Sequence, residues 1–239
     1  MNSRADSTAI KILELLALVG DMSSDEICCF FKSESYIRKV LSSLRNDNFI
    51  KKSKNTEKTT YRLALAGKKK LKSYLPDIFN ALLSDRKSMN VVRDDKGYKE
   101  RRKKLLEILT LFHRADIKIF PDEKVLLRKK FVGTRTDNTD KIKFVENSCP
   151  EFYTALEIKE IIPDFNIAKG SRFLGILVSY GRVYIIYSTY DGELLWRKET
   201  EIKFRTCARL CMSKKYSVTM KYAKKNCSKV INVFETAMY

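Results

Sequence analysis

The order of short elements between residues 7 and 71 constrains the fold of this chain most strongly. Helical patterns cover residues 7–20, 23–31 and 33–46, and two β-rich segments, 49–54 and 59–63, follow them. The second β-rich segment passes directly into a further helical pattern. Three helices, a hairpin and another helix in this order predict a winged helix-turn-helix.

The third helix of this series has two contrasting faces. Its apolar residues share one side of a helical wheel, and the opposite side is small, polar and cationic. Short side chains allow close approach to base edges, and cations meet phosphates, so this pattern favours a helix in the major groove. An ordinary solvated face is the alternative. The apolar side holds Ile37, Val40, Leu41 and Leu44, and the polar side holds Ser35, Lys39, Ser42 and Asn46, flanked by Arg38.

A sharp change of charge favours the nucleic-acid interpretation. Residues 1–31 contain two basic and five acidic groups, whereas residues 32–72 contain thirteen basic and three acidic groups. The whole chain carries a formal charge of +19, which favours nucleic acid as a partner before an anionic membrane surface. No apolar run reaches about 18 residues, so no membrane span is expected. Glu14 interrupts the apolar stretch near the start, which argues against a signal peptide.

The sequence therefore predicts contacts to double-stranded DNA from this helix and from the hairpin. Side chains of the helix would meet base edges and nearby phosphates, and hairpin lysines would touch the flanking backbone or minor groove. About six phosphate contacts would reduce affinity on the order of a thousandfold between 50 and 200 mM salt. The candidate DNA-binding residues are Ser35, Tyr36, Arg38, Lys39, Ser42, Arg45, Lys51, Lys52, Lys54 and Lys58.

The end of the hairpin carries a spaced motif. Tyr61-x-Leu63-x-x-x-Gly67-x-x-x-Leu71 joins the second strand to the next helix. It resembles the same join in winged helices of the multiple-antibiotic-resistance repressor type. The resemblance implies that residues 1–80 form a winged helix-turn-helix DNA-binding domain. A winged helix that binds protein is the alternative.

The rest of the chain predicts a second domain, which makes the fold class α+β. Residues 81–104 are interpreted as a charged linker that merges into a helix at 98–114, and residues 105–239 as a C-terminal α/β domain with a small sheet. In that domain the patterns predict strands at 117–120, 125–132, 172–179, 182–189 and 193–198, and helices at 154–161 and 200–235.

Several kinds of chemistry find no support in the sequence. His113 is the single histidine and has no acid or cysteine at ligand spacing, so we expect a structural role for it. The six cysteines form no CxxC unit and are expected to be small buried residues in a reducing compartment, the cytoplasm. No Gly-rich phosphate loop is present, so no cofactor is expected.

Motifs beyond residue 100 add a second resemblance. They are Arg101-Arg102-x-x-Leu105 and the segments 114–117, 121–124, 152–159 and 170–177. Together with the preceding winged helix they resemble the replication-relaxation group of winged-helix proteins, found on plasmids and integrative conjugative elements. The resemblance implies a role in plasmid replication or in conjugative DNA processing. It also implies a C-terminal domain related in fold to restriction endonucleases.

A nuclease of that fold needs an Asp and a following Glu-x-Lys triplet that together bind a divalent metal and activate water. Glu201 and Lys203, with Asp191 before them, fit the spacing, but Asp191 lies in a predicted turn. Residues 157–159 match the same triplet on a predicted helix. We therefore expect this domain to be catalytically degenerate, with no metal or catalytic residues assigned.

The leading hypothesis is a sequence-specific DNA-binding protein of a plasmid or integrative conjugative element. A winged-helix transcriptional repressor is the alternative, and a metal-dependent nicking nuclease or relaxase is the third hypothesis. Besides double-stranded DNA, the candidate partners are a relaxase or a replication protein and a second copy of the chain, which would form a homodimer. No membrane partner is expected.

Overall fold

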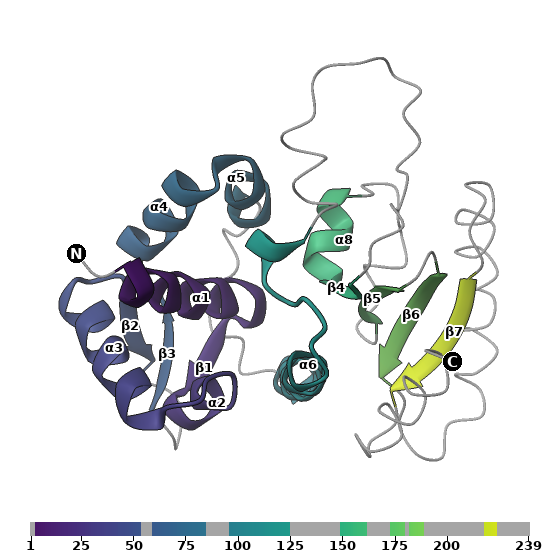
Figure 1. Cartoon of the computed structure of the whole chain (residues 1–239), viewed down its shortest axis with the longest axis horizontal. Coiled ribbons are helices and arrows are strands. Elements are labelled where there is room, and N and C mark those ends of the chain that lie inside the picture. The colour runs from purple at the N-terminus through teal and green to yellow at the C-terminus, as the bar shows by residue number, and fades with distance from the viewer. Residues whose placement is uncertain are drawn as a thin grey trace. The chain divides into compact units, whose positions relative to one another are not determined.

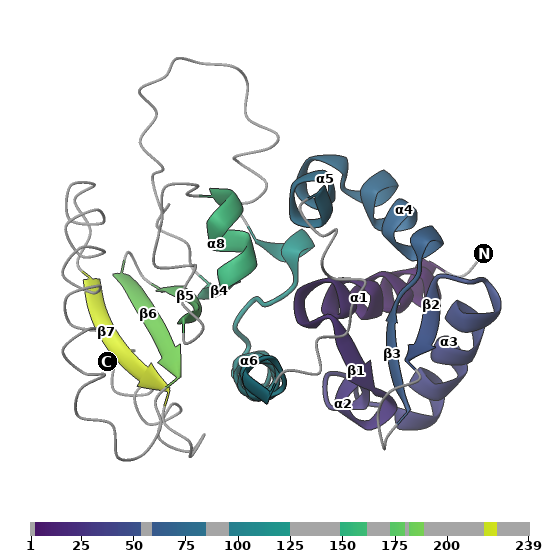
Figure 2. The same ribbon diagram turned by 180° about the vertical axis from the view of Figure 1, so that it is seen from behind.

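The computed structural model describes residues 3–53, 59–84, 96–124, 149–161, 173–179, 182–188 and 218–223 (Figure 1, and from behind in Figure 2). The chain divides into two compact units. The first unit comprises Met1–Arg93 together with Phe120–Glu123, and the second comprises Asp94–Ile119 and Lys124–Tyr239. Each unit combines helices with a small sheet, which confirms the predicted α+β class.

The first unit follows the predicted order of elements and adds one strand that the sequence did not indicate. This strand, β1, lies between the first two helices. The elements are α1 (Ser3–Val19), β1 (Asp21–Ser23), α2 (Ser24–Cys28), α3 (Glu34–Asn46), β2 (Ile50–Ser53), β3 (Thr60–Leu63), α4 (Leu65–Tyr74), α5 (Pro76–Ser84) and the distant 3-10 helix η2 (Pro121–Glu123).

The three strands of the first unit form an antiparallel sheet in the order β1-β3-β2. In the predicted hairpin Lys51 lies opposite Arg62, and on the other side of β3 Met22 lies opposite Tyr61. Because β3 is the central strand, the hairpin is hydrogen-bonded to the segment that directly precedes α2. The sheet therefore fixes the hairpin relative to the start of α2.

Helix α1 forms the centre of the core of the first unit. Ile12, Leu13 and Leu15 are 0% exposed, and the helix is buried on more sides than a single apolar stripe would require. It packs against α3, α4, β1 and β3. Full burial of each such side chain contributes about 1.5–3 kcal/mol. Helix α1 is thus the scaffold against which α3 and the sheet are held.

The surroundings of Gly67 explain why the Tyr-x-Leu-x-x-x-Gly motif has a glycine at this position. A Cβ at this position would lie 2.2 Å from the carbonyl oxygen of Phe49. That carbonyl also accepts a hydrogen bond from the backbone N–H of Ala64 at 2.9 Å. Helix α4 therefore begins in direct contact with the backbone that leads into β2, and only glycine fits this close approach.

The second unit contains one long helix and a four-stranded sheet in the order β4-β5-β6-β7. The first three strands are antiparallel, and β7 runs parallel to β6. The predicted helix at 154–161 and the predicted strands at 172–179 and 182–189 are confirmed. The elements are α6 (Lys96–Arg114), β4 (Glu151–Thr154), α8 (Ala155–Ile161), β5 (Phe173–Ser179), β6 (Arg182–Ser188) and β7 (Val218–Ala223).

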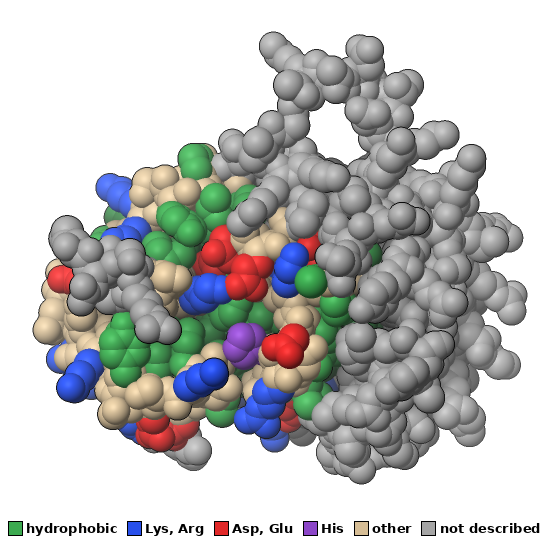
Figure 3. All heavy atoms as spheres, viewed as in Figure 1, with side chains coloured by type: hydrophobic (Ala, Val, Ile, Leu, Met, Phe, Trp, Pro, Cys, Tyr) green, Lys and Arg blue, Asp and Glu red, His purple; other side chains and the backbone are tan. Residues whose placement is uncertain are grey.

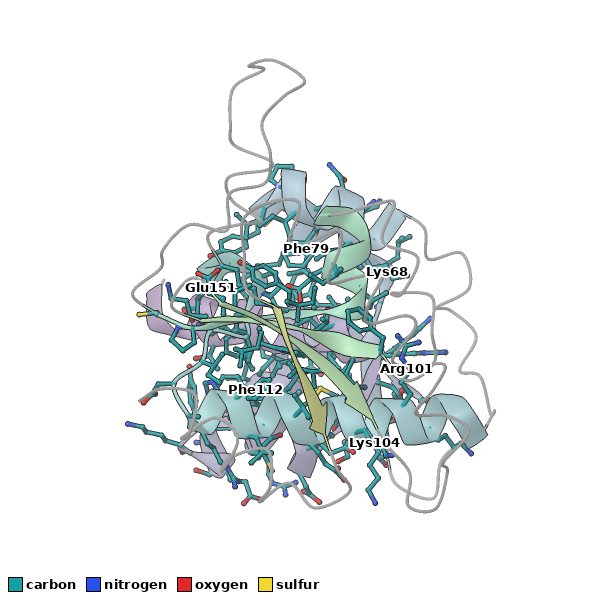
Figure 4. The ribbon with its side chains drawn as sticks, turned by 90° about the vertical axis from the view of Figure 1, so that its right-hand side faces the viewer. Lys68, Phe79, Arg101, Lys104, Phe112 and Glu151 are labelled. Atoms are coloured by element: carbon teal, nitrogen blue, oxygen red, sulfur yellow. The ribbon has the colours of Figure 1, made fainter. Side chains whose placement is uncertain are left out.

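Helix α6 packs on this sheet through an aromatic contact. The ring of Phe112 meets the ring of Phe152 edge-on, with the centroids 4.9 Å apart (Figure 4). At the neighbouring bulge of β5, a Cβ at Gly175 would lie 2.1 Å from the carbonyl oxygen of Tyr153. Both contacts are fully buried, so they define the core of the described part of the second unit.

Four expectations for the second half of the chain need correction or remain outside the described residues. The predicted helix at 200–235 is wrong at Val218–Ala223, which forms strand β7 because its β-branched and aromatic residues pair with β6. Residues 117–120 contribute a single bridge, between Lys118 and Glu151, rather than a strand. The predicted strands at 125–132 and 193–198 lie outside the described residues.

The interval between the two units also differs in its boundaries. Helix α5 reaches Ser84 and helix α6 begins at Lys96, so both extend into the range 81–104 interpreted as linker. The expectation of buried cysteines is wrong where it can be checked, because Cys28 is half-buried and Cys29 and Cys149 are exposed near the ends of elements. In the described ranges no helix has both the length and the apolar character needed to cross a membrane.

Candidate nucleic-acid interface

Helices α2 and α3 are positioned by local capping signals. The Ser23 hydroxyl accepts a hydrogen bond from the backbone N–H of Glu26 at 3.2 Å, and the Glu26 carboxylate accepts one from the backbone N–H of Ser23 at 2.7 Å. This is a reciprocal capping box, and its Ser-x-x-Glu pattern is present in the sequence. Helix α3 ends at Asn46, and Asn48, two residues later, adopts a left-handed φ of 57° and turns the chain into β2.

The two faces of α3 are separated as predicted. Its apolar residues are all buried against the first unit, whereas the opposite side is exposed to solvent. Tyr36 is one of the larger exposed aromatic side chains, with 39% of its surface accessible. Figure 3 shows basic side chains at the edge of the first unit where Figure 1 draws α3. The exposed members of the predicted set are Ser35, Tyr36, Arg38, Lys39, Ser42 and Arg45.

Arg38 forms ion pairs with two carboxylates. Its Nη2 lies 2.5 Å from Oε1 of Glu34, one turn earlier, and 3.1 Å from Oδ1 of Asp25 on α2. Its Nε donates to the same Glu34 oxygen at 3.0 Å. The hydrogen bond and the charge of Glu34 raise the pKa of Arg38, so the guanidinium stays charged, but its donors are engaged. Sequence reasoning assigned Arg38 to base edges or phosphates; the structure shows that it joins α2 to α3.

The hairpin adds cations beside α3. Lys51 and Lys52 are both exposed on β2. Lys54 and Lys58, which the sequence also predicts to contact DNA, lie outside the described residues. The exposed cations of the candidate interface that form no ion pair with another described residue are Lys39, Arg45, Lys51 and Lys52. We call these four residues the basic set.

Two acidic residues at this surface were missed from the sequence. Asp25 and Glu34 are both well exposed, and these two carboxylates share one arginine, Arg38. The Glu34–Arg38 pair could have been found from its i, i+4 spacing on a helix. The Asp25 contact could not, because it depends on how α2 packs on α3. Nearby, burial and then the charge of Glu34 raise the pKa of the Cys28 thiol, which disfavours a reactive thiolate there.

The second unit contains a buried ionic cluster that explains one of the candidate nuclease triplets. Lys124 and Glu157 are both 0% exposed, and Lys124 Nζ lies 2.6 Å from Glu157 Oε1. The other oxygen of Glu157 accepts hydrogen bonds from the backbone N–H and the hydroxyl of Thr154, at 2.7 and 2.9 Å. Glu157 is thus an ion-pair partner and helix cap, so the 157–159 triplet is structural.

The same cluster continues through Glu151, which is 1% exposed. The Tyr153 hydroxyl donates to Glu151 Oε2, and Lys118 Nζ lies 3.6 Å from Glu151 Oε1. In the part of the chain that the structure describes, no group of three or more His, Cys, Asp or Glu residues could hold a metal. Asp191, Glu201 and Lys203, the other nuclease candidates, lie outside the described residues.

Comparisons of the chain with protein-family models, with curated proteins and with solved structures gave no match. The candidate interface is therefore defined by the geometry of the first unit: an outward-facing α3, a basic hairpin strand beside it, and an acid-bound arginine that joins α3 to α2.

Proposed function

We propose that the chain binds double-stranded DNA through a winged helix-turn-helix formed by α2, α3 and the β2–β3 hairpin. The single observation that carries the proposal is the outward face of α3. It is exposed along its length, it carries small polar and cationic side chains, and its opposite face is fully packed. A helix of this kind can enter a major groove without losing its own support.

The topology of the first unit supports the same proposal. A winged helix places a short strand between its first two helices, and that strand pairs with the hairpin called the wing. Here β1 takes that place and pairs with β3, in the sheet order β1-β3-β2. The wing and α3 are thereby parts of one rigid framework, so a duplex that meets α3 also meets β2.

Within this proposal the side chains divide by role. The basic set would contact phosphates, and Ser35, Tyr36 and Ser42 would face base edges between them. With Lys54 and Lys58 of the hairpin, six cations are available for phosphate contacts. Six contacts correspond to a slope of about −5.4 when log K is plotted against log salt concentration.

The decisive experiment measures duplex binding by fluorescence anisotropy between 50 and 200 mM salt. The double variant Lys39→Ala/Arg45→Ala removes two cations of the basic set and should reduce the magnitude of the salt slope by about 1.8. The matched control is Lys69→Ala/Lys72→Ala on α4, which removes the same charge from a helix outside the interface. Equal loss of affinity in both variants would show that only net charge matters and would refute the assignment of α3.

The nature of the DNA site decides between the two biological roles. A replication or transfer origin as the preferred duplex would favour the plasmid role implied by the resemblance to the replication-relaxation group. A palindromic promoter site would favour the repressor. Anisotropy with the genetic element's own intergenic DNA against a scrambled duplex separates the two, and a preference that survives 200 mM salt would establish sequence specificity.

For the second unit we propose a non-catalytic role in positioning or in partner binding, on a degenerate scaffold related to restriction endonucleases. The support is the use of Glu157 in the buried cluster, which removes one of the two Glu-x-Lys triplets from metal chemistry. A plasmid-nicking assay with Mg²⁺ tests this role. Nicking that is lost in Glu201→Ala would overturn it and restore the nuclease hypothesis.

A further inference from the structure

A buried carboxyl group and a half-buried one form a pair in the first unit that has no role in the proposed DNA contact. Glu14 lies in the middle of α1 and is 0% exposed. Asp122 lies in η2, which is distant in sequence but belongs to the same unit. Neither oxygen of Glu14, nor Oδ1 of Asp122, has a hydrogen-bond partner among the described residues, and all three are buried.

Two ionised carboxylates at this place would be unstable. A carboxylate has only acceptors, so two of them cannot hydrogen-bond to each other, and Glu14 would stay desolvated beside a like charge. One proton changes this, because a protonated carboxyl can donate to its neighbour. Burial raises the pKa of Glu14 well above its ordinary value, and the charge of Asp122 raises it further. The burial of Glu14, its two oxygens without a partner and the neighbouring charge agree that Glu14 holds a proton.

The contacts around the pair connect η2 to α1. Lys11, one turn before Glu14, forms an ion pair with Glu123, and its ammonium lies 4.3 Å from the centroid of the Phe120 ring. Phe120 is 2% exposed and Pro121 is also buried. Figure 3 shows acidic and basic side chains close together over the region where Figure 1 draws α1 and η2. Residues 120–123 are therefore held on α1 by two buried apolar residues, one ion pair and the carboxyl pair.

The charged groups that act on Glu14 come from two elements. From η2, Asp122 opposes its ionisation, and from its own helix Lys11 favours ionisation. Lys11 is also engaged by Glu123, so it is shared between the two carboxylates. The other elements packed on α1 carry charges of their own. Those that are at least partly buried are Asp21 on β1, Arg62 on β3, and Lys68, Lys70 and Lys72 on α4.

We propose that a proton on Glu14, donated toward Asp122, holds residues 120–123 on α1, and that loss of this proton releases the segment. The contact between α1 and residues 120–123, which directly precede the buried Lys124, then depends on this proton. It holds at low pH and weakens as the pH rises through the titration of Glu14. The proposal is independent of DNA binding.

Hydrogen exchange on the full chain tests the proposal. The amide of Glu123 donates to the carbonyl of Phe120 at 3.1 Å, so its protection reports whether η2 is formed. In the unmodified protein this protection, corrected for intrinsic exchange, should fall at least several-fold as the pH rises. In Glu14→Gln, whose amide is neutral and can donate at every pH, protection should not depend on pH. Asp47→Asn, which removes an exposed carboxylate at the end of α3, is the control and should behave like the unmodified protein.

A second measurement keeps the test valid if a variant folds poorly. Carboxyl ¹³C shifts of the unmodified protein should show Glu14 titrating well above an ordinary glutamate. Titration of Glu14 in the ordinary range, near its unperturbed value of about 4.3, would overturn the proposal. Identical pH dependence of the Glu123 amide in the unmodified protein and in Glu14→Gln would overturn it as well.

Discussion

Removal of the Lys124 ammonium should strongly destabilise the second unit. Lys124 and Glu157 are both 0% exposed and their charged atoms are 2.6 Å apart. Breaking such a pair from one side leaves a buried, uncompensated charge and costs about 3–5 kcal/mol. Glu157 keeps its two hydrogen bonds from Thr154, so Lys124→Met should fall near the lower end of this range.

The partner substitutions give this prediction its internal test. In Lys124→Met/Glu157→Gln no charge remains, and the amide oxygen can still accept from Thr154. Replacing both partners of a buried pair is often close to neutral, so the double variant should recover most of the loss, with a coupling free energy of about 2–3 kcal/mol. Lys118→Met is the control, because its pair with Glu151 is longer, at 3.6 Å, and its own side chain is 32% exposed. Glu151 is itself 1% exposed but keeps the hydrogen bond from the Tyr153 hydroxyl, so this variant should lose less stability than Lys124→Met.

The assay is urea unfolding followed by tryptophan fluorescence. The single tryptophan, Trp196, falls in the residue range of the second unit, so its signal reports that unit. For a loss of about 3 kcal/mol and a slope of about 2 kcal/mol per molar urea, the midpoint should fall by about 1.5 M. Equal midpoints for Lys124→Met and Lys118→Met would refute the reasoning, because the deeper burial and shorter distance of the Lys124 pair are the reasons to expect them to differ.

Three further predictions follow from the geometry. Gly67→Ala gains about 1 kcal/mol of helix propensity but places a Cβ 2.2 Å from the Phe49 carbonyl oxygen. The melting temperature of the first unit, measured by circular dichroism, should therefore fall by several degrees. An unchanged or higher melting temperature would contradict the close approach. Gly175→Ala places a Cβ 2.1 Å from the Tyr153 carbonyl oxygen and should lower the urea midpoint of the second unit, and an unaltered midpoint would count against the bulge. Asp25→Asn/Glu34→Gln frees Arg38, so duplex affinity should rise several-fold and the salt slope should steepen by about 1; an unchanged slope would place Arg38 away from the DNA.

Elements with local signals were predictable, and those that depend on distant pairing were not. The capping box at Ser23 and Glu26 fixed the start of α2 from four residues of sequence. Strand β1 has three residues, too few for an alternation pattern, and exists because β3 offers it an edge. Strand β7 lies in a lysine-rich stretch with helical spacing, and its pairing with β6 overrides that local preference.

The same division applies to the candidate site. The faces of α3 could be read from periodicity, because burial follows the wheel. The ion pairs that charged side chains form with other elements could not be predicted, because they depend on residues from other parts of the chain. Asp25 reaches Arg38 only once α2 packs on α3, and Lys11 meets Glu123 from 112 positions away. Sequence patterns therefore located the surface, but they did not show which of its cations form ion pairs with acidic residues of the same unit.

This distinction changes the meaning of the charge step that first indicated a nucleic-acid partner. In the formal count residues 1–31 are net negative and residues 32–72 strongly positive. In the folded first unit, Glu14 is buried under conditions that favour its neutral form, and Asp25 is matched to Arg38. The acidic segment therefore repels a phosphate backbone less than its formal charge suggests, while one arginine of the basic segment is already engaged. The cations that remain exposed for a duplex are the basic set of Lys39, Arg45, Lys51 and Lys52. The Lys39→Ala/Arg45→Ala variant and its α4 control measure whether the placement of the two cations on α3, rather than the total charge of +19, determines the affinity.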